Sequence, residues 1–164
     1  AMGAKTIGTS RTAEKLERAK MFGLNEAILT GENAEFAGIL TSKNGGGVDV
    51  ILDLVGGGYF SENLECLRLK GRLMLVGLTS GNRAEIDLSM ALVKRLRITG
   101  TTLRGRTLEE KAEATRNFAE QGVPLLADGT IVPNLDKVFA VDRVREAHEY
   151  LESNDSFGKV VLEF

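Results

Sequence analysis

Short apolar runs alternate with amphipathic segments along this chain, and that alternation restricts its fold more than any other feature. The runs lie at residues 5–10, 26–31, 48–56, 72–78 and 97–103. The third run, VDVILDLVG, is almost continuous in β-branched and leucine residues, as in a strand that helices cover on both faces. We therefore expect a parallel β-sheet in which this third strand is central.

The segments between the apolar runs have the length and pattern of crossover helices. We expect short helices at residues 12–22, 34–42, 59–69 and 88–95, and a longer helix at 108–121. The longer helix begins with TLEEKAE, which places acidic residues in the first turn, where the helix dipole favours them.

The two ends of the chain follow a different pattern. Residues 1–3 resemble the tail of a helix, and residues 131–164 carry a strand (KVFAVD), a helix (VREAHEYLES) and a last strand (GKVVLEF). We therefore expect one α/β sheet domain over residues 1–130 and a strand-helix-strand tail over 131–164.

Composition limits the partners that this chain can have. Its 164 residues suffice for one domain with a real core. The 21 basic and 23 acidic residues create no strong field, so neither nucleic acid nor a membrane surface is an expected partner. Cys66 and His148 are the only cysteine and histidine, which excludes a disulfide framework and an all-Cys/His zinc site, and a reducing cytoplasm fits best.

The residues at the end of the first apolar run suggest a nucleotide site. Ser10 and Arg11 stand where the second strand of a dinucleotide-binding unit faces the adenosine ribose. An acid there selects NAD, whereas a basic or small polar residue accommodates the 2′-phosphate of NADP. Lys15 follows Arg11 by four residues and would share its helix face. The alternative is that both cations are ordinary solvated surface charges.

A dinucleotide-binding fold needs another strand and a GxGxxG turn before this one, and the chain contains neither. The glycines of KNGGGVD precede a strand and form a connecting loop, and those of VGGGYF follow a strand with the wrong spacing. The sequence therefore predicts an incomplete Rossmann-type, doubly wound parallel sheet. Without its first strand, such a sheet opens between residues 5–10 and 48–55.

Three stretches carry a family resemblance: AKTIGTSRTAEKLERAKMFGLNEAI, GGGVDVILDLVGGGYFSENLECLRLKGRLMLVGLTSG and VREAHEYLESNDSFGKVVLEF. They resemble the cofactor-binding half and C-terminal tail of the quinone oxidoreductases, the zeta-crystallin-like branch of the zinc-free medium-chain dehydrogenases/reductases. The resemblance implies a C-terminal fragment without its GroES-like substrate domain. It also implies hydride transfer from NADPH to a quinone or conjugated carbonyl, with the cofactor supplying the chemistry and no catalytic residue in this chain.

The same resemblance implies which residues contact NADPH. Ser10, Arg11 and Lys15 correspond to the 2′-phosphate site. Thr30 stands where the family often has a tyrosine, and Asn154 where it sometimes has an arginine, and these two departures weaken the implied phosphate site. The other implied contacts come from loops that follow three strands: Leu54, Val55 and Gly56; Val76, Gly77 and Thr79; and Thr101, Thr102 and Leu103. Ordinary turn chemistry is the alternative explanation for Gly77 and Gly81.

The resemblance also implies a homodimer through the edge strand at Ile98–Leu103, and an open edge gives a physical motive for such pairing. Two alternatives remain open within this fold: an enoyl or alkenal reductase of the same superfamily, and a catalytically inactive Rossmann-like module. A methyltransferase is disfavoured because Ser10 stands where an acid is expected. His148 and Cys66 are expected to be structural, and Asp53 to cap a loop. Without the glycine-rich turn, we expect the isolated chain to be inactive and to bind NADPH weakly.

Overall fold

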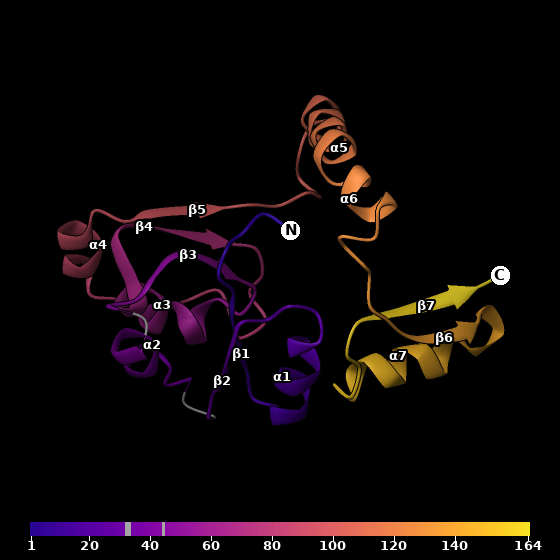
Figure 1. The fold of residues 1–164 in the computed structure, drawn as a ribbon, viewed down its shortest axis with the longest axis horizontal. Coiled ribbons are helices and arrows are strands. Elements are labelled where there is room, and N and C mark those ends of the chain that lie inside the picture. Colours follow the sequence, from indigo (N-terminus) through magenta and orange to yellow (C-terminus); the bar gives the residue numbers. More distant parts are fainter. Residues whose placement is uncertain (32–33, 44) are drawn as a thin grey trace. The chain divides into compact units, whose positions relative to one another are not determined.

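The computed structural model describes residues 1–31, 34–43 and 45–164 (Figure 1). These residues form two compact units, which we call the sheet unit (Lys5–Thr107) and the tail unit (Ala1–Ala4 with Leu108–Phe164). The domain boundary predicted at residue 130 falls inside the tail unit. Asn44, part of the predicted KNGGGVD loop, lies outside the described residues.

The sheet unit alternates strands and helices as the apolar periodicity predicts, which confirms the α/β class. Most of its strands end earlier than predicted, because the apolar runs continue into the loops that follow them. The helix predicted at 59–69 ends at Cys66, and β4 begins at Leu67, before the predicted strand. The elements are β1 (Ile7–Ser10), α1 (Ala13–Lys20), β2 (Glu26–Leu29), α2 (Ala37–Lys43), β3 (Val48–Asp53), a 3₁₀ turn (Gly57–Tyr59), α3 (Phe60–Cys66), β4 (Leu67–Leu75), α4 (Leu88–Lys94) and β5 (Arg97–Gly100).

All strand pairs of the sheet unit are parallel, but they form two separate ladders. β1 pairs with β2, and β4 pairs with β3 on one side and with β5 on the other. Among the described strands no ladder joins β1 to β3. The central place predicted for β3 is therefore wrong here, because β3 has a partner on one edge and β4 occupies the middle.

One face of the β3-β4-β5 ladder is covered by helices of its own unit. Leu73 of β4 is buried with Leu64 and Leu67, and Met90 of α4 packs against this cluster. On the opposite face Val50 and Leu52 are 46% and 67% exposed. Within the sheet unit, the expectation that helices cover both faces is therefore not met.

A second buried cluster connects the two ladders. It contains Ile28 of β2, several residues of α2 and of the segment just before α2, and Cys66 at the end of α3. Ile7 of β1 and Val48 of β3 pack against it. The cluster therefore takes side chains from both ladders, and it holds them in one unit without a shared strand.

The start of α2 depends on a carboxylate from another helix. The Oε2 atom of Glu62, in α3, accepts hydrogen bonds from the backbone N–H groups of Phe36 and Ala37, both at 2.7 Å. It satisfies two of the amides that a helix start leaves unpaired. The predicted helix start, Ala34, is instead a buried residue with a φ of 56°.

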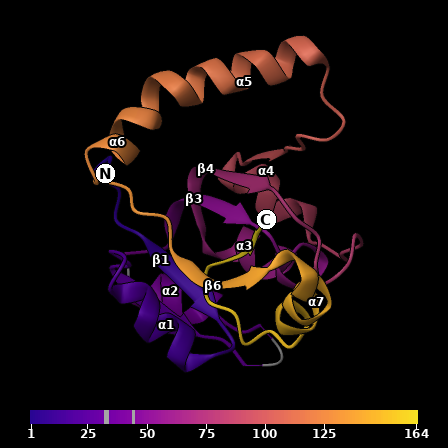
Figure 2. The same cartoon turned by 90° about the vertical axis from the view of Figure 1, so that its right-hand side faces the viewer.

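The tail unit contains α5 (Leu108–Gln121), α6 (Val123–Ala127), β6 (Leu135–Ala140), a 3₁₀ turn (Val141–Arg143), α7 (Val144–Glu152) and β7 (Lys159–Glu163). β6 and β7 are parallel, and α7 runs beside β6 (Figure 2). No predicted helix corresponds to α6, whose Pro124 lies in the first turn, where proline costs no hydrogen bond. Residues 1–3 are not helical. No helix in the described part of the chain is long and apolar enough to cross a membrane.

We predict that Cys66 is unreactive while the sheet unit is folded. Its side chain is fully buried, and burial raises the pKa of its thiol to about 11. At pH 8 roughly one thiol in a thousand would be ionised, and a reagent would reach it only through opening of the core. Ellman's reagent should therefore react at least about a hundredfold faster in 6 M guanidinium chloride than in native buffer. Equal rates would show that the cluster around Cys66 is not packed.

Candidate functional site

Asp53, the last residue of β3, organises the loops at the carboxyl end of the β3-β4-β5 ladder. Its buried carboxylate accepts hydrogen bonds at Oδ1 from the N–H groups of Val55 (2.7 Å) and Gly56 (3.0 Å), and at Oδ2 from the carboxamide of Asn63 (3.0 Å). Its backbone carbonyl accepts from the N–H groups of Val76 and Gly77. The expected loop-capping role of Asp53 is confirmed, and the sequence signal was an acid at the end of an apolar strand.

Hydrogen bonds also tie the loop after β3 to the loop after β4. The N–H and hydroxyl groups of Ser80 both donate to the carbonyl of Val55 at 2.8 Å. The same hydroxyl oxygen accepts from the N–H of Gly58 at 2.8 Å, and the N–H of Gly57 donates to the carbonyl of Gly81 at 2.9 Å. The two loops therefore form one ordered edge, to which Ser80, absent from the predicted site, contributes most.

Glycine is required in these loops for two different reasons. Gly81 has a φ of 113°, so ordinary turn chemistry explains it. Gly77 has no such φ, but a Cβ there would lie 2.7 Å from the carbonyl oxygen of Leu54, and one at Gly57 would lie 2.2 Å from that of Arg83. Gly57 and Gly77 are therefore needed for close approach of the two loops.

Around these glycines, the predicted contact residues Leu54 and Val76 expose apolar surface at the strand ends. Thr79 donates its hydroxyl proton to the carbonyl of Leu54 at 3.3 Å. The structure therefore brings together the predicted residues of the β3 and β4 loops at one edge.

The predicted phosphate residues begin at the end of β1. The backbone carbonyl of Ser10 accepts from the N–H of Thr30 at 2.9 Å, so two predicted residues from neighbouring strands lie side by side. The hydroxyl oxygen of Ser10 accepts from the N–H of Thr12 at 3.1 Å. Arg11 is exposed, and Lys15 is half-buried in the first turn of α1. Among the described residues of this corner, Arg11 and Lys15 supply positive charge, and neither β1 nor β2 ends in an acid.

The side chain of Thr30 points into the core. Thr30 is 3% exposed, and its hydroxyl forms a 3.1 Å hydrogen bond with the hydroxyl of Tyr59, whose ring packs against Phe36. Tyr59 is not among the predicted site residues, because nothing local to VGGGYF predicts a hydrogen-bond partner 29 residues away. Asn154 lies in the tail unit, in the turn after α7.

β5 ends at Gly100, so Thr101, Thr102 and Leu103 form a loop instead of continuing the predicted strand. The N–H of Thr101 donates to the carbonyl of Leu75 at 2.9 Å, and its hydroxyl accepts from the guanidinium of Arg106 at 3.0 Å. Arg106 therefore helps to hold Thr101, a role that no local sequence signal predicts.

The comparisons with known proteins agree on one family. The profile of the family described as "Zinc-binding dehydrogenase" matches residues 1–120. Over 167 residues the chain is 30% identical to quinone oxidoreductase 1 of Escherichia coli K12, a match covering 99% of the chain and 50% of that protein. It is 29% identical over 166 residues to the 2-haloacrylate reductase of a Burkholderia species, covering 98% of the chain and 48% of that protein.

A solved structure supports the same assignment. The E. coli quinone oxidoreductase complexed with NADPH matches with a TM-score of 0.78 and 29% identity, over 98% of this chain and 50% of that one. The resemblance inferred from the sequence is thereby confirmed, and the chain spans about half the length of the relatives it matches. Among the described residues, no three His, Cys, Asp or Glu side chains group together in a way that could hold a metal ion.

We predict that Gly57→Ala destabilises the sheet unit by about 1–3 kcal/mol, because the added methyl group would overlap the carbonyl oxygen of Arg83. The matched control is Gly38→Ala in α2, where a Cβ meets no atom within 4 Å and alanine should stabilise the helix by about 0.5–1 kcal/mol. Urea unfolding measures both. If the two variants changed stability alike, the close approach of the two loops would not be tight.

Proposed function

Since the chain belongs to the zinc-binding dehydrogenases, a family of oxidoreductases, we propose that it is the NADPH-binding portion of a reductase that transfers hydride to a quinone or conjugated carbonyl compound. The observation that carries this proposal is the corner where Ser10 and Thr30 meet, with Arg11 and Lys15 beside them and no acid at the strand end. Because the chain spans about half of its relatives, we propose that it works within a longer protein.

The donor set at this corner fits the 2′-phosphate of NADPH. The oxygen of the Ser10 side chain is occupied as an acceptor, so its hydroxyl proton remains to donate to an anion. Arg11 is exposed at the start of α1, where its guanidinium can pair with two phosphate oxygens. In this proposal Thr30 contributes through its backbone bond to Ser10, because its own hydroxyl is buried against Tyr59.

The loops after β3 and β4 supply the rest of the proposed cofactor surface. In doubly wound sheets, ligands bind outside the carboxyl ends of the strands. The apolar faces of Leu54 and Val76 lie there, on a backbone that Asp53 orders. NADPH, when bound, supplies the hydride, and the residues of this chain bind and orient it. Thr101, held by Arg106, is the proposed residue nearest the nicotinamide.

The acceptor is proposed as a quinone, with the enoyl alternative tested beside it. The quinone oxidoreductase of E. coli and the 2-haloacrylate reductase match this chain at nearly the same identity. Quinones and 2-haloacrylates, the substrates in the names of these two relatives, both accept hydride at an electron-poor carbon conjugated to a carbonyl group. We further infer a cytoplasmic location, which the free thiol of Cys66 supports.

We predict that Arg11→Ala, made in the longer protein, weakens NADPH binding about ten- to a hundredfold and leaves NADH binding nearly unchanged, because one charge-assisted phosphate contact is lost. The measurement is the KM for each cofactor, from oxidation followed at 340 nm with 1,4-benzoquinone and, separately, 2-chloroacrylate as acceptor.

The matched control is Lys20→Ala, which removes a cation at the other end of α1, where Lys20 pairs with Glu17 at 2.6 Å. It should leave both KM values unchanged. An equal loss for both cofactors in Arg11→Ala would show that Arg11 supports folding. Failure to oxidise either cofactor with either acceptor would refute the proposed function.

We also propose a homodimer through the outer edge of β5. The four residues of β5 are exposed, and β4 is their ladder partner on one side. The N–H of Thr101 points toward β4, so by alternation along a parallel strand the N–H groups of Ile98 and Gly100 point away from it. Those outward groups can pair with a second copy of the strand, which would extend the sheet across both subunits.

We predict that Ile98→Pro converts the dimer into a monomer, because proline removes one outward N–H group without removing a bond to β4. The control is Ile98→Val, which keeps the backbone donor and should stay dimeric. Sedimentation velocity at tens of micromolar protein measures both. A monomeric wild-type chain, or a dimer that survives the proline, would contradict the proposed edge contact.

A further inference from the structure

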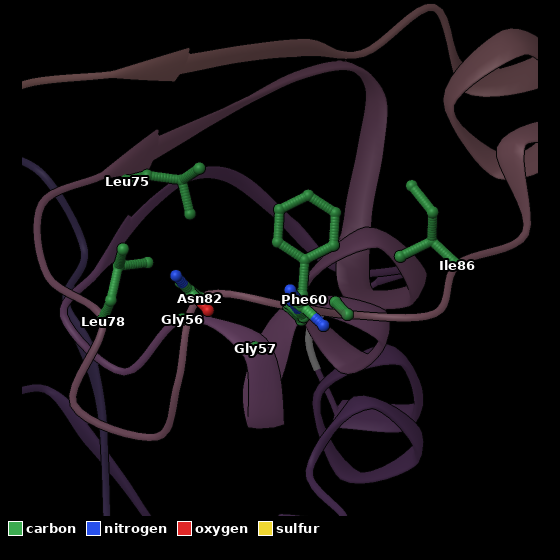
Figure 3. A pocket seen from close by; sticks show the side chains of 9 residues that line it. Gly56, Gly57, Phe60, Leu75, Leu78, Asn82 and Ile86 are labelled. Carbon is green, nitrogen blue, oxygen red and sulfur yellow. The ribbon is translucent and has the colours of Figure 1, made fainter.

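A hollow of about 220 Å³ opens beside the loops after β3 and β4, on the side of the ladder that α3 and α4 cover (Figure 3). Its walls are the side chains of Phe60, Leu75, Leu78 and Ile86. Three of these, Phe60, Leu75 and Ile86, also pack against the buried cluster of Leu64, Leu67 and Leu73. The floor of the hollow is therefore the helix-side core of the sheet unit.

The hollow adjoins the loops of the proposed cofactor surface, but it is lined by other elements than the phosphate corner. The phosphate corner lies at the ends of β1 and β2, whereas the hollow is lined from α3, the end of β4 and the loop that leads to α4. The hollow and the proposed cofactor loops share Gly56, whose N–H donates to the carboxylate of Asp53. A ligand in the hollow would therefore contact side chains that the proposed function does not use.

The size and walls of the hollow suit one aromatic ring. Apolar cavities of about 150 Å³ are large enough to hold benzene, so 220 Å³ accommodates a single ring with a small substituent. In Figure 3 the side chains of Leu75 and Leu78 lie on one side of the ring of Phe60, and that of Ile86 lies on the other. Burial of a ring against such walls supplies the apolar part of the affinity.

The polar lining indicates the substituent. Asn82 contributes a carboxamide, and Arg83 is the only charged residue among the nine described residues that line the hollow. The backbone of Arg83 is fixed against Gly57, where no side chain could fit between them. An arginine among the lining residues favours a carboxylate ligand over a neutral or cationic one.

We propose that this hollow is a binding site for a monocyclic aromatic carboxylate, with the ring packed against Phe60 and the aliphatic side chains and the carboxylate at Asn82 and Arg83. The proposed ligand contacts no side chain to which the proposed function assigns a role, and its test uses no cofactor, so its outcome is separate from that of the cofactor experiment.

The test is a titration of the 164-residue chain, labelled at its methyl groups, with benzoate and with benzylamine, followed by NMR. Benzoate should shift the methyl signals of Leu75, Leu78 and Ile86 saturably, with a Kd on the order of 1 mM, as befits so small a ligand. Benzylamine, which has the same ring and the opposite charge, should bind at least about tenfold more weakly. Absence of a saturable benzoate shift, or equal binding of both probes, would overturn the proposal.

Two variants locate the site. Ala84→Phe places a ring in the hollow and should abolish the benzoate shifts, while the remaining methyl spectrum reports that the fold is intact. Arg83→Gln should weaken benzoate about tenfold and leave benzyl alcohol unchanged, whereas Arg116→Gln, an exposed arginine of α5, should change neither. Benzoate shifts that persist in a folded Ala84→Phe chain would show that the ligand binds elsewhere.

Discussion

The buried cluster around α2 is the constraint on which the sheet unit depends. β1 and β3 share no ladder, so backbone hydrogen bonds do not hold their two sheets together. Side chains do so instead: Phe36, Leu40 and Cys66 fill the space between the sheets, and the hydroxyl groups of Thr30 and Tyr59 meet across it at 3.1 Å. A packed core of this kind tolerates little change in volume. The relative position of the two strand ends therefore rests on this cluster.

The geometry of the proposed cofactor surface also depends on this buried cluster, because the surface takes residues from both sheets. One of its corners, at Ser10, belongs to the β1-β2 sheet, and the loops that Asp53 orders belong to the other sheet. Arg11 can contribute to a site shared with Leu54 and Val76 only if the cluster keeps the two sheets in register. In this proposal Tyr59 and Glu62, which have no predicted cofactor contact, affect binding through the positions of the elements that they join.

The exposed face of the β3-β4-β5 ladder fits the proposal that this chain works within a longer protein. Parallel sheets normally bury both faces, yet Val50 and Leu52 are exposed on one face within the sheet unit. The edges of β1 and β3 that lack a ladder partner support the same proposal, because an unpaired edge offers a template for another strand. An exposed face and unpaired edges are what the predicted incomplete sheet would show. They also agree with a chain that spans about half the length of its relatives.

The type and order of nearly all elements followed from the sequence by itself, because strand and helix periods of two and 3.6 residues are local properties that a chain displays without its partners. The positions of Ser10, Arg11 and Asp53 at strand ends followed for the same reason. Only the tertiary structure decided that β3 lies at a sheet edge and that the hydroxyl of Thr30 forms a hydrogen bond with Tyr59. It also decided that position 77 must be glycine, because the carbonyl oxygen of Leu54 leaves no room for a Cβ there. Each of these results depends on atoms that are distant in sequence and meet only when the core packs, and no local pattern encodes such a meeting.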